Sequence, residues 1–161
     1  MQRAVTAGVA VEAVAHDSPV QAQPPGRVRG YDHVALPMQN TDAMLAFYRA
    51  LGCDIAEYPY AVSVYVGGGQ MINFHLPQTW QRGFDLRAHA ATPPCGDFCF
   101  VWDGSAESLH ALLDKVGAAI VEGPVERQGG RQADASSVYV RDPDGNLVEF
   151  MIYGEEGADA G

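Results

Sequence analysis

The sequence predicts an α+β domain built from two copies of one βαβββ module. The segment SVYV occurs at 63–66 and again at 137–140. Each copy is followed by a glycine-containing turn and an apolar strand, and each is preceded by a strand, a helix and a strand. Two units are too few for a solenoid, which needs at least three to bury a continuous core, so the two modules must share one core.

The first module opens with a predicted strand at 31–38, followed by a helix at 40–52. Asn40 or Thr41 can cap this helix and Gly52 can end it. Its apolar side chains follow the i, i+3, i+4, i+7 spacing of one helix face: Met44, Phe47, Tyr48 and Leu51. Strands at 53–59, over the first SVYV and at 70–76 complete the module.

The second module repeats this order, with a strand at 96–103 and a helix at 105–117. Ser105 is the predicted cap and Gly117 the predicted end of this helix. Its apolar stripe consists of Leu109, Leu112, Leu113 and Val116. The strand CDIAEYP of the first module matches AAIVEGP of the second, and the turn DPDG precedes the final strand, which is typical of a hairpin.

The repeat also sets the predicted boundaries. They are an N-terminal extension (1–29), a single domain (30–153) made of module 1 (30–76), a linker (77–95) and module 2 (96–153), and an acidic tail (154–161).

Composition excludes several kinds of partner. The chain carries 10 Lys and Arg against 20 Asp and Glu, a formal net charge of −10, which repels nucleic acid and anionic lipid. It has no apolar run near the roughly 20 residues of a spanning helix. The N-terminal segment is a poor match to a signal peptide, and three cysteines without framework spacing favour reduced thiols, so we expect a cytoplasmic protein.

Strand alternation predicts which side chains share a face. Val34 and Leu36 should pack under the helices, which leaves His33 on the opposite face. The same reasoning gives a set of polar residues on the faces away from the helices: His33, Asn73, His75, Asp97 and Glu149. Two such faces brought together would enclose a cleft lined by His33, by Asn73 or His75, and by the carboxylates of Asp97 and Glu149. These ligand types indicate a first-row divalent metal site, with the choice between Asn73 and His75 open.

Five segments together resemble the vicinal oxygen chelate superfamily, which includes glyoxalases, bleomycin-resistance proteins and extradiol dioxygenases. They are DHVALPMQNTDAMLAFYRALG, INFH, GDFCFVWD, GPVERQG and SVYVRDPDGNLVEFMIY, and the resemblance covers residues 31–153. It is closest to small glyoxalase-domain proteins. It implies paired βαβββ modules that form a half-open barrel around a divalent metal, usually in a homodimer.

The resemblance also implies a ligand set. His33 and Glu149 match the metal ligands on the first and last strands, and His75 matches the histidine of the INFH segment. Asp97 departs from the pattern, because many members carry histidine there. Two histidines and one carboxylate with open coordination positions favour Fe²⁺, with Mn²⁺, Ni²⁺ or Zn²⁺ as alternatives. Such a metal can act as a Lewis acid on vicinal oxygens or can bring dioxygen to a chelated substrate.

Further residues are predicted to act on the substrate. Glu149, His89 and Tyr139 are the catalytic candidates, with His89 of the linker as a base. Arg127 could hold an anionic substrate. The remaining candidate substrate contacts are Asn73, Asp97 and Tyr153.

These residues favour a metal-dependent enzyme that rearranges, cleaves or oxygenates a small oxygenated molecule. The alternative is a metal-free protein that sequesters a drug or metabolite, for which an acidic cleft would suit a cationic ligand. A purely structural dimerisation module would leave His33 and Glu149 without a role. The expected partners are a small-molecule substrate and a second copy of the chain.

Overall fold

The computed structural model describes residues 26, 28–83 and 85–154. The chain divides into two units, Met1–Gly30 and Tyr31–Gly161. The predicted N-terminal extension and acidic tail lie outside the described residues, except for positions 26, 28, 29 and 154. No helix among the described residues is long and apolar enough to cross a membrane.

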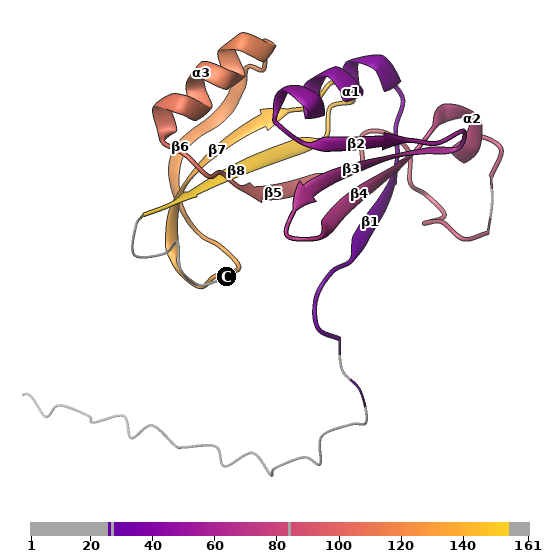
Figure 1. The fold of residues 1–161 in the computed structure, drawn as a ribbon, viewed down its shortest axis with the longest axis horizontal. Helices are drawn as coiled ribbons and strands as arrows, with labels where there is room; N and C mark the ends of the chain where they lie inside the picture. The colour runs from indigo at the N-terminus through magenta and orange to yellow at the C-terminus, as the bar shows by residue number, and fades with distance from the viewer. Residues whose placement is uncertain (1–25, 27, 84, 155–161) are drawn as a thin grey trace, which may run out of the picture. The chain divides into compact units, whose positions relative to one another are not determined.

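The second unit contains two four-stranded mixed sheets (Figure 1). Sheet A has the strand order β1-β4-β3-β2, and sheet B has the equivalent order β5-β8-β7-β6. The strands of sheet A are β1 (His33–Pro37), β2 (Asp54–Glu57), β3 (Ala61–Gly67) and β4 (Gln70–His75). Those of sheet B are β5 (Asp97–Val101), β6 (Ile120–Gln128), β7 (Asp134–Arg141) and β8 (Leu147–Tyr153). In each sheet the first and last strands of the module pair in parallel and the other pairs are antiparallel. The predicted α+β class of paired βαβββ modules is confirmed.

The helices begin and end close to where their sequences predict. In α3 (Ala106–Val116) the hydroxyl of Ser105 accepts a hydrogen bond from the N–H of Ser108, and Gly117 ends the helix with φ +69°. In α1 (Thr41–Ala50) Asn40 occupies the N-cap position, but its side chain donates to the carbonyl of Pro143 and does not cap the helix. A short helix that the sequence did not reveal, α2 (Pro77–Trp80), begins the linker.

One core unites the modules, as a two-unit repeat requires. Buried side chains from α1, β3 and β4 of module 1 pack with others from α3, β7 and β8 of module 2. Leu36, Phe98, Phe100 and Trp102 pack against this core, as strand alternation predicts. Val34 does not: it is 37% exposed and lines a pocket between β1 and β5.

The two SVYV segments lie in equivalent strands, β3 and β7, but they are two residues out of register. The backbone N–H of Met38 bonds to the carbonyl of His75, and the N–H of Trp102 bonds to that of Met151, which makes His75 and Met151 equivalent. By this equivalence Asn73 corresponds to Glu149. Asn73 pairs with Ser63, the first residue of the first SVYV, whereas Glu149 pairs with Tyr139, the third residue of the second SVYV. Because the slip is an even number of residues, it leaves every side chain on its predicted face.

Candidate metal and substrate site

The sheet face turned away from the helices, called here the open face, carries the predicted ligands of module 1. On this face of sheet A, His33 of β1 lies beside Met71 of β4. Two residues further along β4, Asn73 lies between Ala35 of β1 and Ser63 of β3. Two residues further again, His75 lies beside Pro37 of β1. His33, Asn73 and His75 are named here half-site A. His33 and His75 are separated by four residues along paired strands, about 13 Å, so Asn73 is nearer to His33 than His75 is.

His33 is held by its neighbour in the sequence. Its Nδ1–H donates to Oδ1 of Asp32 at 2.7 Å, and about half of its side chain is exposed. A carboxylate on one ring nitrogen fixes the tautomer and leaves Nε2 as the free ligand atom, which is the usual arrangement for metal-binding histidines.

His75 lies in different surroundings, in a small pocket with Pro37, Trp80 and Arg87. Burial, and secondarily the charge of Arg87, lowers the pKa of His75. Its imidazole is therefore neutral at pH 7, which is the form that binds metals.

The open face of sheet B centres on Glu149. Register places Glu149 between Cys99 of β5 and Tyr139 of β7. Oε1 of Glu149 is buried and has no hydrogen-bond partner among the described residues. Glu149, Tyr139, Arg127 and Asp97 are named here half-site B.

The Glu149 carboxylate contributes to raised pKa values of its two neighbours, Cys99 and Tyr139. Burial raises the pKa of the Cys99 thiol to about 12, with further contributions from the charge and hydrogen bonding of Glu149 and from the charge of Asp97. The pKa of Tyr139 is raised as well, first by burial and then by Glu149. Both groups are protonated at neutral pH, so the Cys99 thiol and the Tyr139 hydroxyl each carry a hydrogen that can be donated to the Glu149 carboxylate.

Arg127 is linked to this group through Tyr139. Its Nε–H donates to the Tyr139 hydroxyl at 3.3 Å, and its guanidinium also contacts Glu122 at 3.1 Å. The structure therefore brings three predicted site residues, Arg127, Tyr139 and Glu149, into one group. Asp97 is exposed at the start of β5, where it is the equivalent of His33.

Two predicted candidates lie apart from that group. His89 is exposed in the linker. Tyr153, at the end of β8, places its hydroxyl 3.5 Å from the sulfur of Met151, and Arg131 lies over its ring at 4.8 Å.

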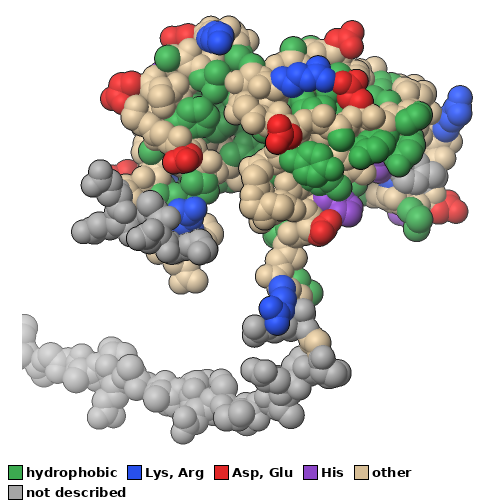
Figure 2. Space-filling view, viewed as in Figure 1, with side chains coloured by type: hydrophobic (Ala, Val, Ile, Leu, Met, Phe, Trp, Pro, Cys, Tyr) green, Lys and Arg blue, Asp and Glu red, His purple; other side chains and the backbone are tan. Residues whose placement is uncertain are grey.

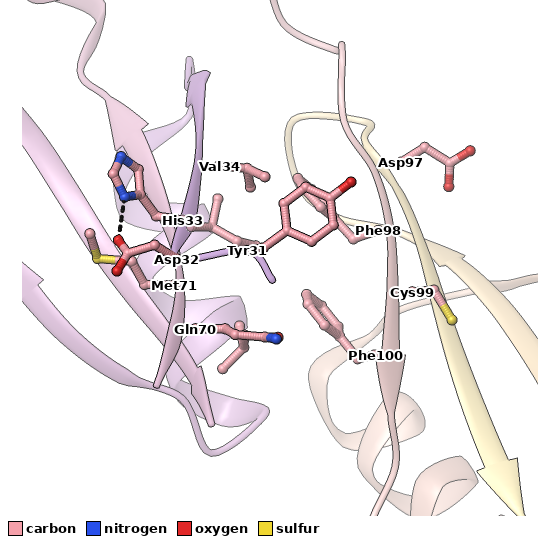
Figure 3. Close-up of a pocket in the computed structure, with 12 residues that line it drawn as sticks. Tyr31, Asp32, His33, Val34, Gln70, Met71, Asp97, Phe98, Cys99 and Phe100 are labelled. Atoms are coloured by element: carbon pink, nitrogen blue, oxygen red, sulfur yellow. Dashed lines mark hydrogen bonds and ion pairs between the residues drawn. The ribbon is translucent and has the colours of Figure 1, made fainter. Parts of the chain in front are cut away.

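Within one chain the two half-sites do not meet. In the part of the chain that the structure describes, no three His, Cys, Asp or Glu side chains form a group that could hold a metal. Figure 3 shows the His33 side chain directed away from Asp97 and Cys99, which point to the other side of β5. That His33, His75 and Glu149 share an ion thus stays a prediction, and one chain alone does not assemble such a site.

Between β1 and β5 lies a pocket of about 340 Å³ with largely apolar walls (Figure 3). Phe98 and Phe100, with stacked rings, form one wall, and Tyr31, Val34 and Met71 contribute to the other. Its volume is within the range of pockets that take small organic ligands.

Sequence reasoning missed two members of these sites. Asp32 was visible beside His33, but only the structure shows its hydrogen bond. Cys99 is not among the site residues that the sequence predicts, yet it adjoins Glu149. Strand alternation puts Cys99 on the same face as Asp97, but only the register of β5 against β8 shows that it lies beside Glu149. All three cysteines are free thiols, as expected.

The fold and the open-face residues define a protein of paired βαβββ modules with polar half-sites away from its helices. The family model of the Glyoxalase/Bleomycin resistance protein/Dioxygenase superfamily matches residues 30–150, and the chain belongs to this superfamily.

Relatives agree with this assignment. A glyoxalase domain-containing protein of Mycosarcoma maydis is 34% identical over 128 residues, which are 78% of this chain and 69% of that protein. A virulence protein of Salmonella typhimurium is 32% identical over 76% of this chain and 83% of its own length. Its crystal structure superposes with a TM-score of 0.70 at 30% identity, covering 80% of this chain and 100% of that one. The structure of a lactoylglutathione lyase from Agrobacterium tumefaciens gives a TM-score of 0.60 at 26% identity, covering 78% and 95%.

Proposed function

We propose that this protein is a divalent-metal-dependent enzyme that acts on a small oxygenated organic molecule, by isomerase or lyase chemistry or by dioxygenation. The observation that carries the proposal is the buried Oε1 of Glu149, which accepts no hydrogen bond from the described residues although the Cys99 thiol and the Tyr139 hydroxyl lie beside the carboxylate. A carboxylate oxygen withdrawn from water is costly unless a cation or a donor satisfies it. The name of the lyase among the structural relatives supports an enzyme of this kind.

The donor set fits a divalent ion. His33, oriented by Asp32, and Glu149 would hold it, with Asn73 as the third donor, because Asn73 lies nearer to His33 than the predicted ligand His75 does, and His75 is about 13 Å from His33 along the paired strands. An imidazole and a carboxylate with an amide oxygen suit Fe²⁺, and Mn²⁺, Ni²⁺ and Zn²⁺ also accept these ligands. When bound, such an ion supplies Lewis acidity toward two neighbouring oxygens of the substrate.

The chain's own residues would orient the substrate around that position. Tyr139, protonated at neutral pH, can donate a hydrogen bond to a substrate oxygen. Arg127 can bind a negatively charged substrate group beside it. Roles for His89 as a base and for Asp97 and Tyr153 as substrate contacts remain predictions.

The proposal includes a homodimer in which half-site A of one copy faces half-site B of the other. It is supported by the opposite directions of His33 and Asp97 in Figure 3, since both polar faces remain open in a single chain. Closed two-fold pairs are the commonest assemblies of soluble proteins.

Elemental analysis of protein purified without chelator tests metal binding. We expect about one equivalent of a first-row divalent metal per chain, as one three-ligand site requires. The substitutions His33→Ala and Glu149→Ala should each remove it, and His110→Ala, on the surface of α3, should not. Metal-free wild-type protein that also fails to take up Fe²⁺, Mn²⁺, Ni²⁺ or Zn²⁺ would contradict the proposal.

Co-expression of the two variants tests the dimer. If His33 of one copy meets Glu149 of the other, a mixed dimer of His33→Ala and Glu149→Ala chains has one intact and one doubly damaged site. It should therefore bind half the wild-type metal, although each variant alone binds none. If both ligands came from the same chain, every site of the mixed dimer would be damaged and no metal would return.

The second candidate is a metal-free binding protein, which the 340 Å³ apolar pocket between β1 and β5 favours. The two functions make different predictions for the same variants. A sequestering protein would keep its ligand affinity in His33→Ala and Glu149→Ala, and would lose it when Phe98 or Phe100 is changed to Ala.

A further inference from the structure

A small pocket lies on the open face of sheet A, at the end away from His33. It is lined by Ala35 and Pro37 of β1, by His75 of β4 and by Trp80 of α2. The linker closes it through Leu86, Arg87, Ala88 and Ala91. The Trp80 indole N–H donates to the carbonyl of Met38 at 2.9 Å, which fixes the ring against the strand end.

Arg87 is the charged group of this pocket, and it is half-buried. Its Nη1 donates to the carbonyl of Ala91 at 3.0 Å, which holds the linker in a closed turn. Within the described residues, no carboxylate lies at ion-pair distance from Arg87, although the chain has 20 acidic residues against 10 basic ones. A guanidinium has five N–H donors, so most of its hydrogen-bonding capacity remains for another partner.

We propose that this pocket is a binding subsite for the carboxylate group of a small molecule, with Arg87 as the anion-binding group. An unpaired cation withdrawn from water is stabilised by an anion, and the planar guanidinium matches a carboxylate through two parallel hydrogen bonds. Ala35, Pro37 and Trp80 form apolar walls beside the bound group.

The size of the pocket limits what enters it. Its volume is about 80 Å³. This is the volume of roughly two or three water molecules, at about 30 Å³ each, and is well below the ~300 Å³ of sites that enclose whole ligands. The pocket therefore takes one end of a ligand, and the remainder extends along the open face toward Asn73.

Only the role of the subsite rests on the proposed function. In that function, the subsite would orient an oxygenated substrate by a carboxylate group distant from His33. The binding itself needs no metal. The full chain, treated with chelator and labelled with ¹⁵N, provides the test through the indole N–H signals of its two tryptophans, Trp80 in the pocket and Trp102 outside it. Sodium acetate is the probe, with sodium chloride at equal ionic strength and neutral acetamide as controls.

We expect acetate to give a saturable shift of the Trp80 signal, with a Kd on the order of 10 mM, and to leave Trp102 unmoved. Arg87→Gln should weaken acetate binding at least tenfold. Arg87→Lys, which keeps the charge but not the two-pronged geometry, should weaken it less. Arg82→Gln, at an exposed arginine of the same linker, should bind as the wild type does.

The proposal is overturned if chloride or acetamide shifts Trp80 as acetate does, or if Arg87→Gln retains the acetate affinity. The Trp102 signal reports in each variant whether the fold is intact. Metal content separates this inference from the proposed function. Loss of acetate binding in Arg87→Gln with wild-type metal content supports the subsite, and a protein that binds no metal can still show acetate binding at Trp80.

Discussion

Asp144 of the second module accepts hydrogen bonds from the backbone N–H groups of Gln39 and Asn40, both at 2.7 Å. These N–H groups stand at the start of α1, where a helix has donors without internal partners and where its dipole favours negative charge. The turn before β8 thus caps the helix of the other module. It is one of the links that set how the modules pack.

Asp144→Ala should therefore destabilise the protein by about 1–3 kcal/mol, because two charge-assisted hydrogen bonds are lost at the helix N-terminus. Asp144→Asn, which keeps one acceptor oxygen, should fall between the wild type and the alanine variant. Urea unfolding measures both, with the exposed Asp103→Ala as the control expected to change stability by less than about 0.5 kcal/mol. Equal stability of Asp144→Ala and Asp103→Ala would show that the cap contributes nothing.

A second link joins the same turn to α1. The hydroxyl of Tyr48 donates to Oδ2 of Asp142 at 3.1 Å, and both residues are buried. Burial raises the pKa of Asp142, while hydrogen bonds from Asn146 and Tyr48 oppose that rise. A carboxyl whose pKa is higher in the folded state contributes stability that is present in acid and is lost as the pH rises through that pKa.

The substitution Tyr48→Phe removes a hydrogen bond that favours the ionised carboxylate. It should cost about 1–2 kcal/mol at pH 7. The cost should shrink as the pH is lowered toward about 3, below the ordinary Asp pKa of ~3.9, because Asp142, whose pKa is raised in the folded protein, then loses the charge that the hydroxyl stabilises. Urea unfolding of the two proteins across this pH range provides the measurement, and a cost independent of pH would contradict the assigned role of Asp142.

These two links show why the fold was more predictable than the site. Helix stops at Gly52 and Gly117 and the faces of the strands depend on local periodicity, which can be read from the chain. The partners of Asp142 and Asp144 lie about 100 residues away, and DPDG appeared in the sequence only as a turn. Module packing decides whether His33 and Glu149 face each other, and no local pattern carries that information.

The repeat itself illustrates the same limit. Identical SVYV segments suggested equivalent positions, but the first hairpin turns through three glycines and the second through the longer RDPDGN segment. The difference in turn shifts the register by two residues. Strand alternation still predicted the correct face for each side chain. Only the structure shows which residues pair across the strands, such as Tyr139 with Glu149. On the face shown in Figure 2, the Lys and Arg side chains are few and separate.

Gly123 of β6 has a backbone conformation and surroundings that exclude a side chain. Its φ is +120°, and a Cβ there would lie 2.6 Å from the carbonyl oxygen of Ser137 and 2.9 Å from the Cα of Val138. Because both obstacles are backbone atoms of the neighbouring strand, Gly123→Ala should cost about 2 kcal/mol or more. Gly130→Ala, at an open position, should change the free energy of unfolding by less than about 1 kcal/mol. Thermal or urea unfolding of the pair measures the difference, and similar stabilities would refute the expected strain.

The contact between Cys99 and Glu149 can be tested in metal-free protein by thiol chemistry. Burial raises the pKa of Cys99 to about 12, and the negative charge of Glu149 contributes because it opposes formation of the thiolate beside it. Glu149→Gln removes that charge, so the pKa of Cys99 should fall. At a fixed pH below the pKa, each unit of decrease raises the thiolate fraction about tenfold.

Iodoacetamide alkylation at about pH 8.5, near the ordinary pKa of a cysteine thiol, should therefore be slow for Cys99 and several-fold faster in Glu149→Gln. A background with Cys53→Ser and Cys95→Ser isolates the one thiol, because the other two cysteines are also free. Glu126→Gln, at an exposed position of β6, is the matched control and should leave the rate unchanged. If Glu149→Gln and Glu126→Gln alkylate at the same rate, Glu149 does not act on Cys99.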